Sequence, residues 1–172
     1  AKIIPPRFAE KEMAIIIDDI GYDLKPVYEL IRIEEEITFA VLPLLPHSRE
    51  ADRLLQQPGR EVLLHLPMEP VSYPDEKPGS GALFTDMSDE EIVRQLEKNL
   101  ASVPHAVGVN NHMGSKFMAD EEKLTPVFRT LKSANLFFVD SRTTPSSKSA
   151  AVARKTNLPL VSRKVFLDHD RN

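Results

Sequence analysis

Short apolar runs alternate with amphipathic stretches along this chain of 172 residues. The runs predict strands, and apolar residues spaced three or four positions apart predict helices between them. The best-marked helix follows Ser88, where Ser88 and Glu91 form a capping box. Alternation of this kind predicts an α/β fold with a parallel sheet and crossover helices, either as an open sheet or as a barrel. The apolar runs lie at 13–21, 37–42, 61–65, 106–109, 136–139 and 158–167, the last as one bent strand or two short ones.

We expect a single domain over residues 1–172, because a chain of this length with 41% hydrophobic residues can bury a substantial core. Residues 1–12, with Pro5 and Pro6, are expected to form an extended lead-in to the first strand. Residues 70–88 are rich in proline and glycine and predict a long loop. Long loops in compact domains are usually functional or mobile, and we predict that this one lies over the site.

Charge and missing residue types exclude several classes of function. The 22 basic and 26 acidic residues are interspersed, without the basic stripe that nucleic-acid binding requires. No run of about 18 apolar residues predicts a membrane span, and the first residues do not resemble a signal peptide. Cysteine is absent, and neither a Gly-x-Ser-x-Gly motif nor a glycine-rich phosphate loop is present. The remaining chemistry is hydrolysis by water that a metal activates, with a carboxylate as general base.

Polar side chains follow five of the predicted strands. Because the carboxyl ends of parallel strands share one edge of a sheet or barrel, and that edge holds the active site, we expect these side chains to meet there. The five sets are Asp18 with Asp19, His65, Asn110 to His112, Asp140 to Arg142, and Asp168 to Asp170.

Asp19, His65 and His112 are the candidate metal ligands among these residues. Carboxylate oxygen and imidazole nitrogen suit zinc, and a catalytic zinc ion keeps three protein ligands and one water. Each residue also has a structural interpretation. Asp19 with Asp18 can begin a turn or cap a helix, His65 can bind a backbone carbonyl, and His112 can end its strand in water. Asp18 and Asp19 point the same way only if the strand has already ended, because successive side chains alternate.

Glu69, Asp140 and Arg142 allow more than one interpretation. Glu69 is a metal ligand, a partner of a ligand or a loop carboxylate, because Pro67 and Pro70 oppose the helix that would align it with the residue four positions earlier. Asp140 and Arg142 form an exposed ion pair, or Arg142 orients Asp18 or binds a substrate oxygen. His47 and His105 are expected on the solvated surface.

The sequence resembles the divergent polysaccharide deacetylases, a branch of the polysaccharide deacetylase superfamily. The resemblance covers nearly the whole chain in order. It is carried by AIIIDDIG at 14–21, TFAVLP at 38–43, EVLLHLPMEP at 61–70, GVNNHMGS at 108–115, FVDSRTT at 138–144 and VFLD at 165–168.

This resemblance implies an incomplete, distorted parallel β/α barrel whose C-terminal part is missing from this chain, with the family's general-acid histidine beyond Asn172. It implies that Asp18 is the base and Asp19 a metal ligand. Only His65 fits the family's His-x-x-x-His motif because position 69 is glutamate, so His112 is offered as the second imidazole. Asp140 with Arg142 matches the motif that tunes the base, and we expect Asn111 to contact the substrate or a metal ligand.

The implied activity is the removal of N-acetyl groups from a cell-envelope carbohydrate by an enzyme that binds a divalent metal, with zinc preferred. The resemblance also implies a periplasmic or secreted protein. Two alternatives stay open. The first is a non-catalytic envelope module that keeps the metal and binds glycan or protein, and the second is a metal hydrolase of another amide or ester. The sequence does not determine the oligomeric state.

Overall fold

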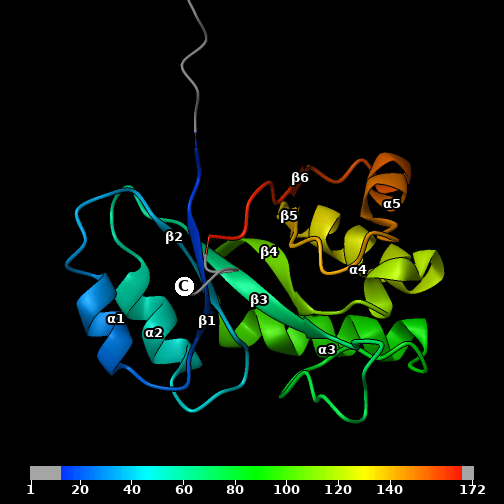
Figure 1. Cartoon of the computed structure of the whole chain (residues 1–172), viewed down its shortest axis with the longest axis horizontal. Helices are drawn as coiled ribbons and strands as arrows, with labels where there is room; N and C mark the ends of the chain where they lie inside the picture. Colours follow the sequence, from blue (N-terminus) through cyan, green and yellow to red (C-terminus); the bar gives the residue numbers. More distant parts are fainter. Residues whose placement is uncertain (1–12, 168–172) are drawn as a thin grey trace, which may run out of the picture.

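The computed structural model describes residues 13–167, which contain six strands in one parallel sheet (Figure 1). The strands stand in the sheet in the order of the sequence, and each pairs in parallel with the next. The predicted α/β fold is confirmed. The expected lead-in at 1–12 and the set Asp168 to Asp170 lie outside the described residues. The strands are β1 (Ile16–Ile20), β2 (Thr38–Val41), β3 (Val62–Met68), β4 (Ala106–Met113), β5 (Phe137–Asp140) and β6 (Leu160–Ser162).

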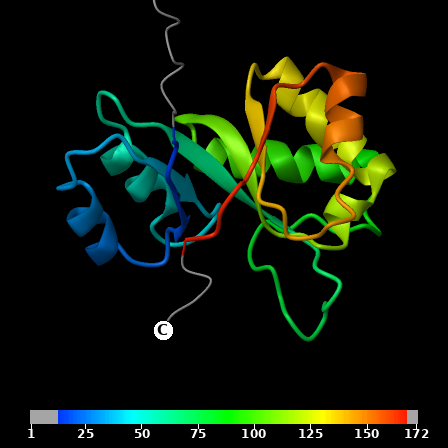
Figure 2. The same cartoon turned by 45° about the horizontal axis from the view of Figure 1, so that its top comes forward.

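Helices connect the strands and lie around the outside of the sheet (Figures 1 and 2). Parallel crossovers are almost always right-handed, so a sheet in sequential order places successive helices on one face. The predicted capping box of Ser88 and Glu91 is present at the start of α3. No helix within residues 13–167 has the length and apolar character to cross a membrane. The helices are α1 (Lys25–Leu30), α2 (Ser48–Leu55), α3 (Asp89–Ser102), α4 (Glu121–Ser133) and α5 (Ser149–Thr156), with the short 3-10 helix η1 (Phe117–Ala119) before α4.

Alternation along the strands gives the sheet two different faces. Residues such as Phe39, Leu64 and Phe138 belong to the large core between the sheet and the helices. Their strand neighbours Ala40, Leu63 and Val139 form a second, small cluster on the opposite, inner face. On β3, alternation directs His65, two positions after Leu63, to the same inner face nearer the carboxyl end of the strand.

The sheet is strongly curved, as in a barrel. In a flat sheet β1 and β4 would lie three strand spacings apart, roughly 14 Å. In this structure the Asp18 carboxylate on β1 accepts a hydrogen bond of 2.8 Å from the Asn110 amide on β4. Side chains this short meet only if the sheet bends around its inner face. The sheet stays open between β1 and β6, which are its two edges within the described residues, so the fold is compatible with an incomplete barrel.

The carboxyl ends of β3, β4 and β6 differ most from the sequence prediction. β3 and β4 continue past His65 and Val109, because their backbones stay paired as far as Met68 and Met113 while the polar side chains face inward. β6 is shorter than the apolar run at 158–167 because its pairing with β5 ends where Asp140 meets Ser162.

His105 lies at the surface with its side chain 37% exposed, as expected, but it is paired with a buried carboxylate. Its Nδ1 lies 2.7 Å from the Oδ2 atom of Asp52, whose side chain in α2 is fully buried. The backbone N–H of His105 also donates to Asp52, at 3.3 Å. Burial raises the pKa of Asp52 against the opposing effect of the His105 hydrogen bond. The pair ties α2 to the segment that enters β4, at the amino end of the sheet.

Replacing His105 tests whether this pair stabilises the fold. We expect His105→Ala to lower the free energy of unfolding by about 1–3 kcal/mol, because the buried Asp52 carboxylate loses its side-chain partner. His105→Asn places an amide N–H near the Nδ1 position and should recover most of that loss. Urea denaturation followed by circular dichroism measures both. Equal stability of His105→Ala and the wild type would contradict the assignment.

Candidate metal centre

A bulge in β1 brings Asp18 and Asp19 to the same side of the sheet. The pairing of β1 with β2 advances three residues on β1, from Ile17 to Ile20, against two on β2. The extra residue is accommodated at Asp19, whose φ of 62° lies in the left-handed region. Ile20 then returns to the outer core. Both carboxylates therefore reach the inner space within a strand that has not ended, which the alternation argument did not anticipate.

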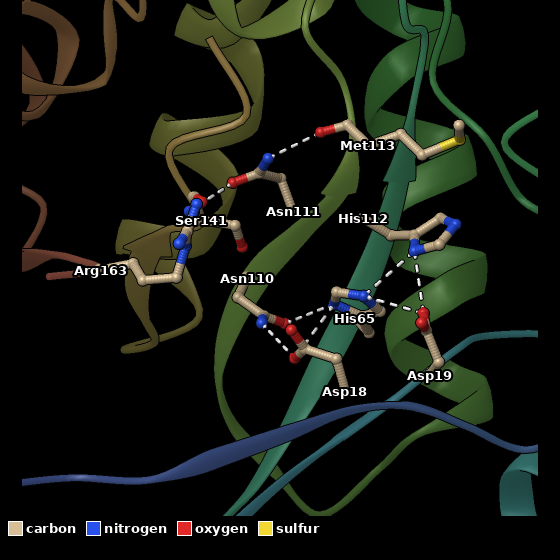
Figure 3. Close-up of polar contacts among 9 residues, drawn as sticks. All are labelled: Asp18, Asp19, His65, Asn110, Asn111, His112, Met113, Ser141 and Arg163. Carbon is tan, nitrogen blue, oxygen red and sulfur yellow. Dashed lines mark hydrogen bonds and ion pairs between the residues drawn. The ribbon is translucent and has the colours of Figure 1, made fainter. Parts of the chain in front are cut away.

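Asp19, His65 and His112 converge on one point at the carboxyl end of the inner face (Figure 3). The Oδ1 atom of Asp19 lies 3.2 Å from Nε2 of His65 and 2.9 Å from Nδ1 of His112. The two imidazole nitrogens are 3.1 Å apart. His65 is buried, whereas Asp19 is 60% exposed, so the cluster has a protein side and an open side.

The donor set fits a zinc ion. Tetrahedral zinc holds nitrogen and oxygen ligands at about 2.0–2.2 Å, which places neighbouring ligand atoms roughly 3.3 Å apart. The three observed separations of 2.9, 3.1 and 3.2 Å approach this value. Two imidazoles and one carboxylate are also a ligand set of catalytic zinc sites that leaves a fourth position open.

Electrostatics favours a positive charge between the three groups. Hydrogen bonds with His112 and His65 hold the pKa of Asp19 far below its usual range. Burial works to lower the pKa of His65, but the hydrogen bond with Asp19 and the charge of Asp18 raise it overall. Asp19 is therefore a carboxylate at physiological pH, and a proton or a metal cation between the three ligand atoms is stabilised.

Asn110 selects the tautomer of His65. Its amide nitrogen donates to Asp18, which as a carboxylate only accepts, so the amide oxygen is the atom 2.8 Å from Nδ1 of His65. Nδ1 must then carry the hydrogen, and the lone pair of neutral His65 lies on Nε2, on the side of Asp19 and His112. A partner on the remote nitrogen is the usual arrangement for a histidine that binds a metal.

Comparison with known proteins assigns the chain to a family. The family model of the divergent polysaccharide deacetylases matches residues 15–172. The chain belongs to this family.

Two relatives of this chain come from bacteria. It is 40% identical over 162 residues to the uncharacterized protein YibQ of Escherichia coli, covering 94% of this chain and 50% of that protein. It is 35% identical over 161 residues to an uncharacterized protein of Haemophilus influenzae, covering 94% of this chain and 57% of the relative. The chain thus spans about half the length of these curated relatives.

The fold is shared with a solved structure. The crystal structure of the uncharacterized protein ATU2773 from Agrobacterium tumefaciens matches with a TM-score of 0.86 and 26% sequence identity. The match covers 91% of this chain and 64% of the solved chain. The α/β arrangement is therefore common to the two proteins.

Glu69 anchors the loop at 70–88. Its carboxylate accepts from the backbone N–H and the hydroxyl of Thr85 and from Lys116, at 2.6–2.7 Å. Burial works to raise the pKa of Glu69, but the hydrogen bonds with Lys116 and Thr85 lower it overall. Of the interpretations left open by the sequence, the structure shows the loop carboxylate. The loop projects beyond the carboxyl ends of the strands (Figure 2).

Asp140 is fully buried and does not form the exposed ion pair with Arg142, which contributes only its backbone N–H to Asp140. The buried Asp140 carboxylate accepts hydrogen bonds from the hydroxyls of Ser147 and Ser149 and from the backbone N–H of Arg142. These donors shape the turn between β5 and α5. The side chain that donates a hydrogen bond to Asp18 is instead the amide of Asn110.

Asn111 points away from the metal ligands, as alternation along β4 requires (Figure 3). Its amide group joins the strand end to the loop after β5, with bonds to the Met113 carbonyl, the Thr143 hydroxyl and the Ser141 N–H. Asn110, two positions before His112, shares the inner face instead. That spacing of two was the signal in the sequence that could have identified Asn110 as part of the site.

Metal-binding measurements test the cluster directly. We expect Asp19→Ala, His65→Ala and His112→Ala each to weaken zinc binding at least about 100-fold, because loss of a ligand exceeds the 10- to 100-fold cost of losing a ligand's hydrogen-bond partner. His105→Asn, at the opposite end of the sheet, is the matched control and should bind zinc as the wild type does. Competition titration with a chromophoric chelator measures the affinities. Unchanged zinc binding in all three ligand variants would refute the site.

Proposed function

We propose that this domain is a metal-dependent hydrolase that removes N-acetyl groups from a cell-envelope carbohydrate, in the periplasm or outside the cell. The observation that carries this proposal is the convergence of Asp19, His65 and His112 next to a further carboxylate, Asp18. Membership of the divergent polysaccharide deacetylase family supports the reaction class.

Asp19, His65 and His112 would hold the divalent cation, and the two imidazoles favour zinc over the harder cations that prefer oxygen ligands. A cation bound there supplies a Lewis acid for the acetyl carbonyl and lowers the pKa of water. The exposed side of Asp19 leaves the cluster accessible to a substrate from solvent. The buried His65 and its partner Asn110 form the rigid side.

Asp18 is suited to act as the general base. It is 35% exposed, and its Oδ1 lies 3.7 Å from Nδ1 of His65, so it is adjacent to the cluster without being one of the three ligands. In the proposed reaction Asp18 accepts a proton from the water that adds to the acetyl carbonyl carbon. The carbon–nitrogen bond then breaks as the proton held by Asp18 passes to the departing nitrogen, and the products are acetate and a free amine on the sugar.

Exposed tyrosines support a carbohydrate as the substrate. Tyr22 follows β1 and is 64% exposed, and Tyr73 in the loop at 70–88 is 43% exposed. The Tyr73 ring packs against Phe84 with centroids 5.0 Å apart, which fixes it on the loop. An aromatic face held in place as Tyr73 is offers an apolar surface to a sugar ring.

A second candidate is an envelope module that binds a metal and a glycan or protein without turnover. The observation that favours it is the engagement of Asp140 by two serine hydroxyls, which leaves the base without the partner that the family resemblance implies. Asn110 supplies a different partner to Asp18, so we place catalysis first.

Acetate release tests the enzymatic proposal. We expect zinc-loaded full-length protein to release acetate from N-acetylglucosamine oligomers, and Asp18→Asn to bind zinc normally while turnover falls about 100- to 10,000-fold, because the amide cannot accept the proton. Asp89→Asn, an exposed residue of α3, is the matched control and should retain full turnover.

Two results would contradict the proposal. If metal-loaded wild type releases no acetate from any N-acetylated oligomer while a known deacetylase does so in parallel, the enzymatic assignment fails and the binding module is favoured. If Asp18→Asn turns over at the wild-type rate, Asp18 is not the base.

A further inference from the structure

We infer that Asn110 is a positioning residue that sets the orientation of both Asp18 and His65 through one amide group. The family resemblance gives the task of holding the base to Asp140 and Arg142. The structure instead places Asn110 between the proposed base and a metal ligand (Figure 3). For turnover this inference rests on the proposed function, whereas for the geometry of the metal ligands it does not.

The placement of Asn110 follows from the strand register. His65 on β3 is the register partner of Asn110 on β4, and alternation directs both side chains to the inner face. Curvature of the sheet brings Asp18 of β1 within 2.8 Å of the same amide. Asn110 is only 1% exposed, so water does not compete freely for these hydrogen bonds.

The two hydrogen bonds require opposite properties of one short side chain. Asp18 as a carboxylate needs a donor, and the Nδ1–H of His65 needs an acceptor. An amide supplies both from one rigid, neutral group. Aspartate supplies only acceptors when ionised, leucine supplies neither, and glutamine is longer by one methylene. Asn110 thus matches this position in hydrogen bonding, charge and length.

Two consequences follow for the site. The bond to Nδ1 keeps the Nε2 lone pair of His65 on the side of Asp19 and His112, so losing it weakens metal binding. The bond to Oδ1 of Asp18 fixes the carboxylate beside the cluster, so losing it lowers turnover without removing a ligand. The two functions are separable by substitution because each uses a different atom of the amide.

Asn110→Asp separates them. It keeps an acceptor for His65 and replaces the donor to Asp18 by a second carboxylate. We expect the zinc affinity of Asn110→Asp to stay within about threefold of the wild type, since carboxylates serve as partners of metal-bound histidines. We expect its kcat to fall about 100-fold with little change in KM. Asn110→Leu and Asn110→Ala both remove the two hydrogen bonds. The leucine side chain still fills the space of the asparagine, whereas alanine leaves that space empty. Each should lose about 10- to 100-fold in zinc affinity and also lose turnover.

A thermal double-mutant cycle gives a readout that needs no turnover. If Asn110 holds Asp18, the Tm loss of Asp18→Ala with Asn110→Ala together will be smaller than the sum of the two single losses. Asn135→Asp is the matched control, because Asn135 is exposed in the turn after α4. It should change neither zinc affinity nor kcat. Circular dichroism before each titration identifies any variant that fails to fold, and the remaining variants then decide.

The outcomes distinguish this inference from the proposed function. Wild-type zinc affinity in a folded Asn110→Leu or Asn110→Ala overturns the role toward His65. Additive Tm losses, or full kcat in Asn110→Asp, overturn the role toward Asp18. A wild type without deacetylase activity, combined with weakened zinc binding in Asn110→Leu and a non-additive thermal cycle, refutes the proposed function and supports the positioning role.

Discussion

Contact between β1 and β4 across the inner face is the constraint on which the site depends. These strands are separated by β2 and β3 in the sheet, yet the Asp18 carboxylate meets the Asn110 amide and the Asp19 carboxylate meets His112. A flat sheet would hold the same side chains far apart. Curvature of the sheet therefore brings together the candidate metal ligands, and the polar contacts in turn link β1 to β4.

The inward-pointing side chains of β3 and β4 are apolar or small at the start of each strand and polar nearer its carboxyl end. Leu63 precedes His65 by two positions on β3, and Gly108 precedes Asn110 by two positions on β4. A Cβ atom at Gly108 would lie 2.7 Å from the Phe137 ring, so glycine lets this aromatic side chain cover the inner face. The apolar half supports the strands, and the polar half lies at their open carboxyl ends.

The sequence was sufficient to predict the parallel sheet, its crossover helices and the convergence of Asp19, His65 and His112, because apolar periodicity and strand-end polarity are local signals. It was insufficient where partners are set by three-dimensional contacts. Four features depend on how strands and helices meet in the folded chain. They are the bulge at Asp19, the hydrogen bond from Asn110 to Asp18, the hydrogen bonds of Asp140 within its own turn, and the burial of Asp52 beneath His105. Glu69 remained ambiguous for the same reason, since its partners Thr85 and Lys116 come from separate segments.

The central claim is that donors distant in the sequence bind one metal ion at the carboxyl end of the curved sheet. A crystal structure of the full-length protein grown with zinc, with anomalous data collected at the zinc edge, tests it most directly. The account predicts one strong peak within about 2.0–2.2 Å of Nε2 of His65, Nδ1 of His112 and an oxygen of Asp19. Zinc bound elsewhere while this cluster shows no peak, or the three donor atoms more than about 10 Å apart, would contradict the account.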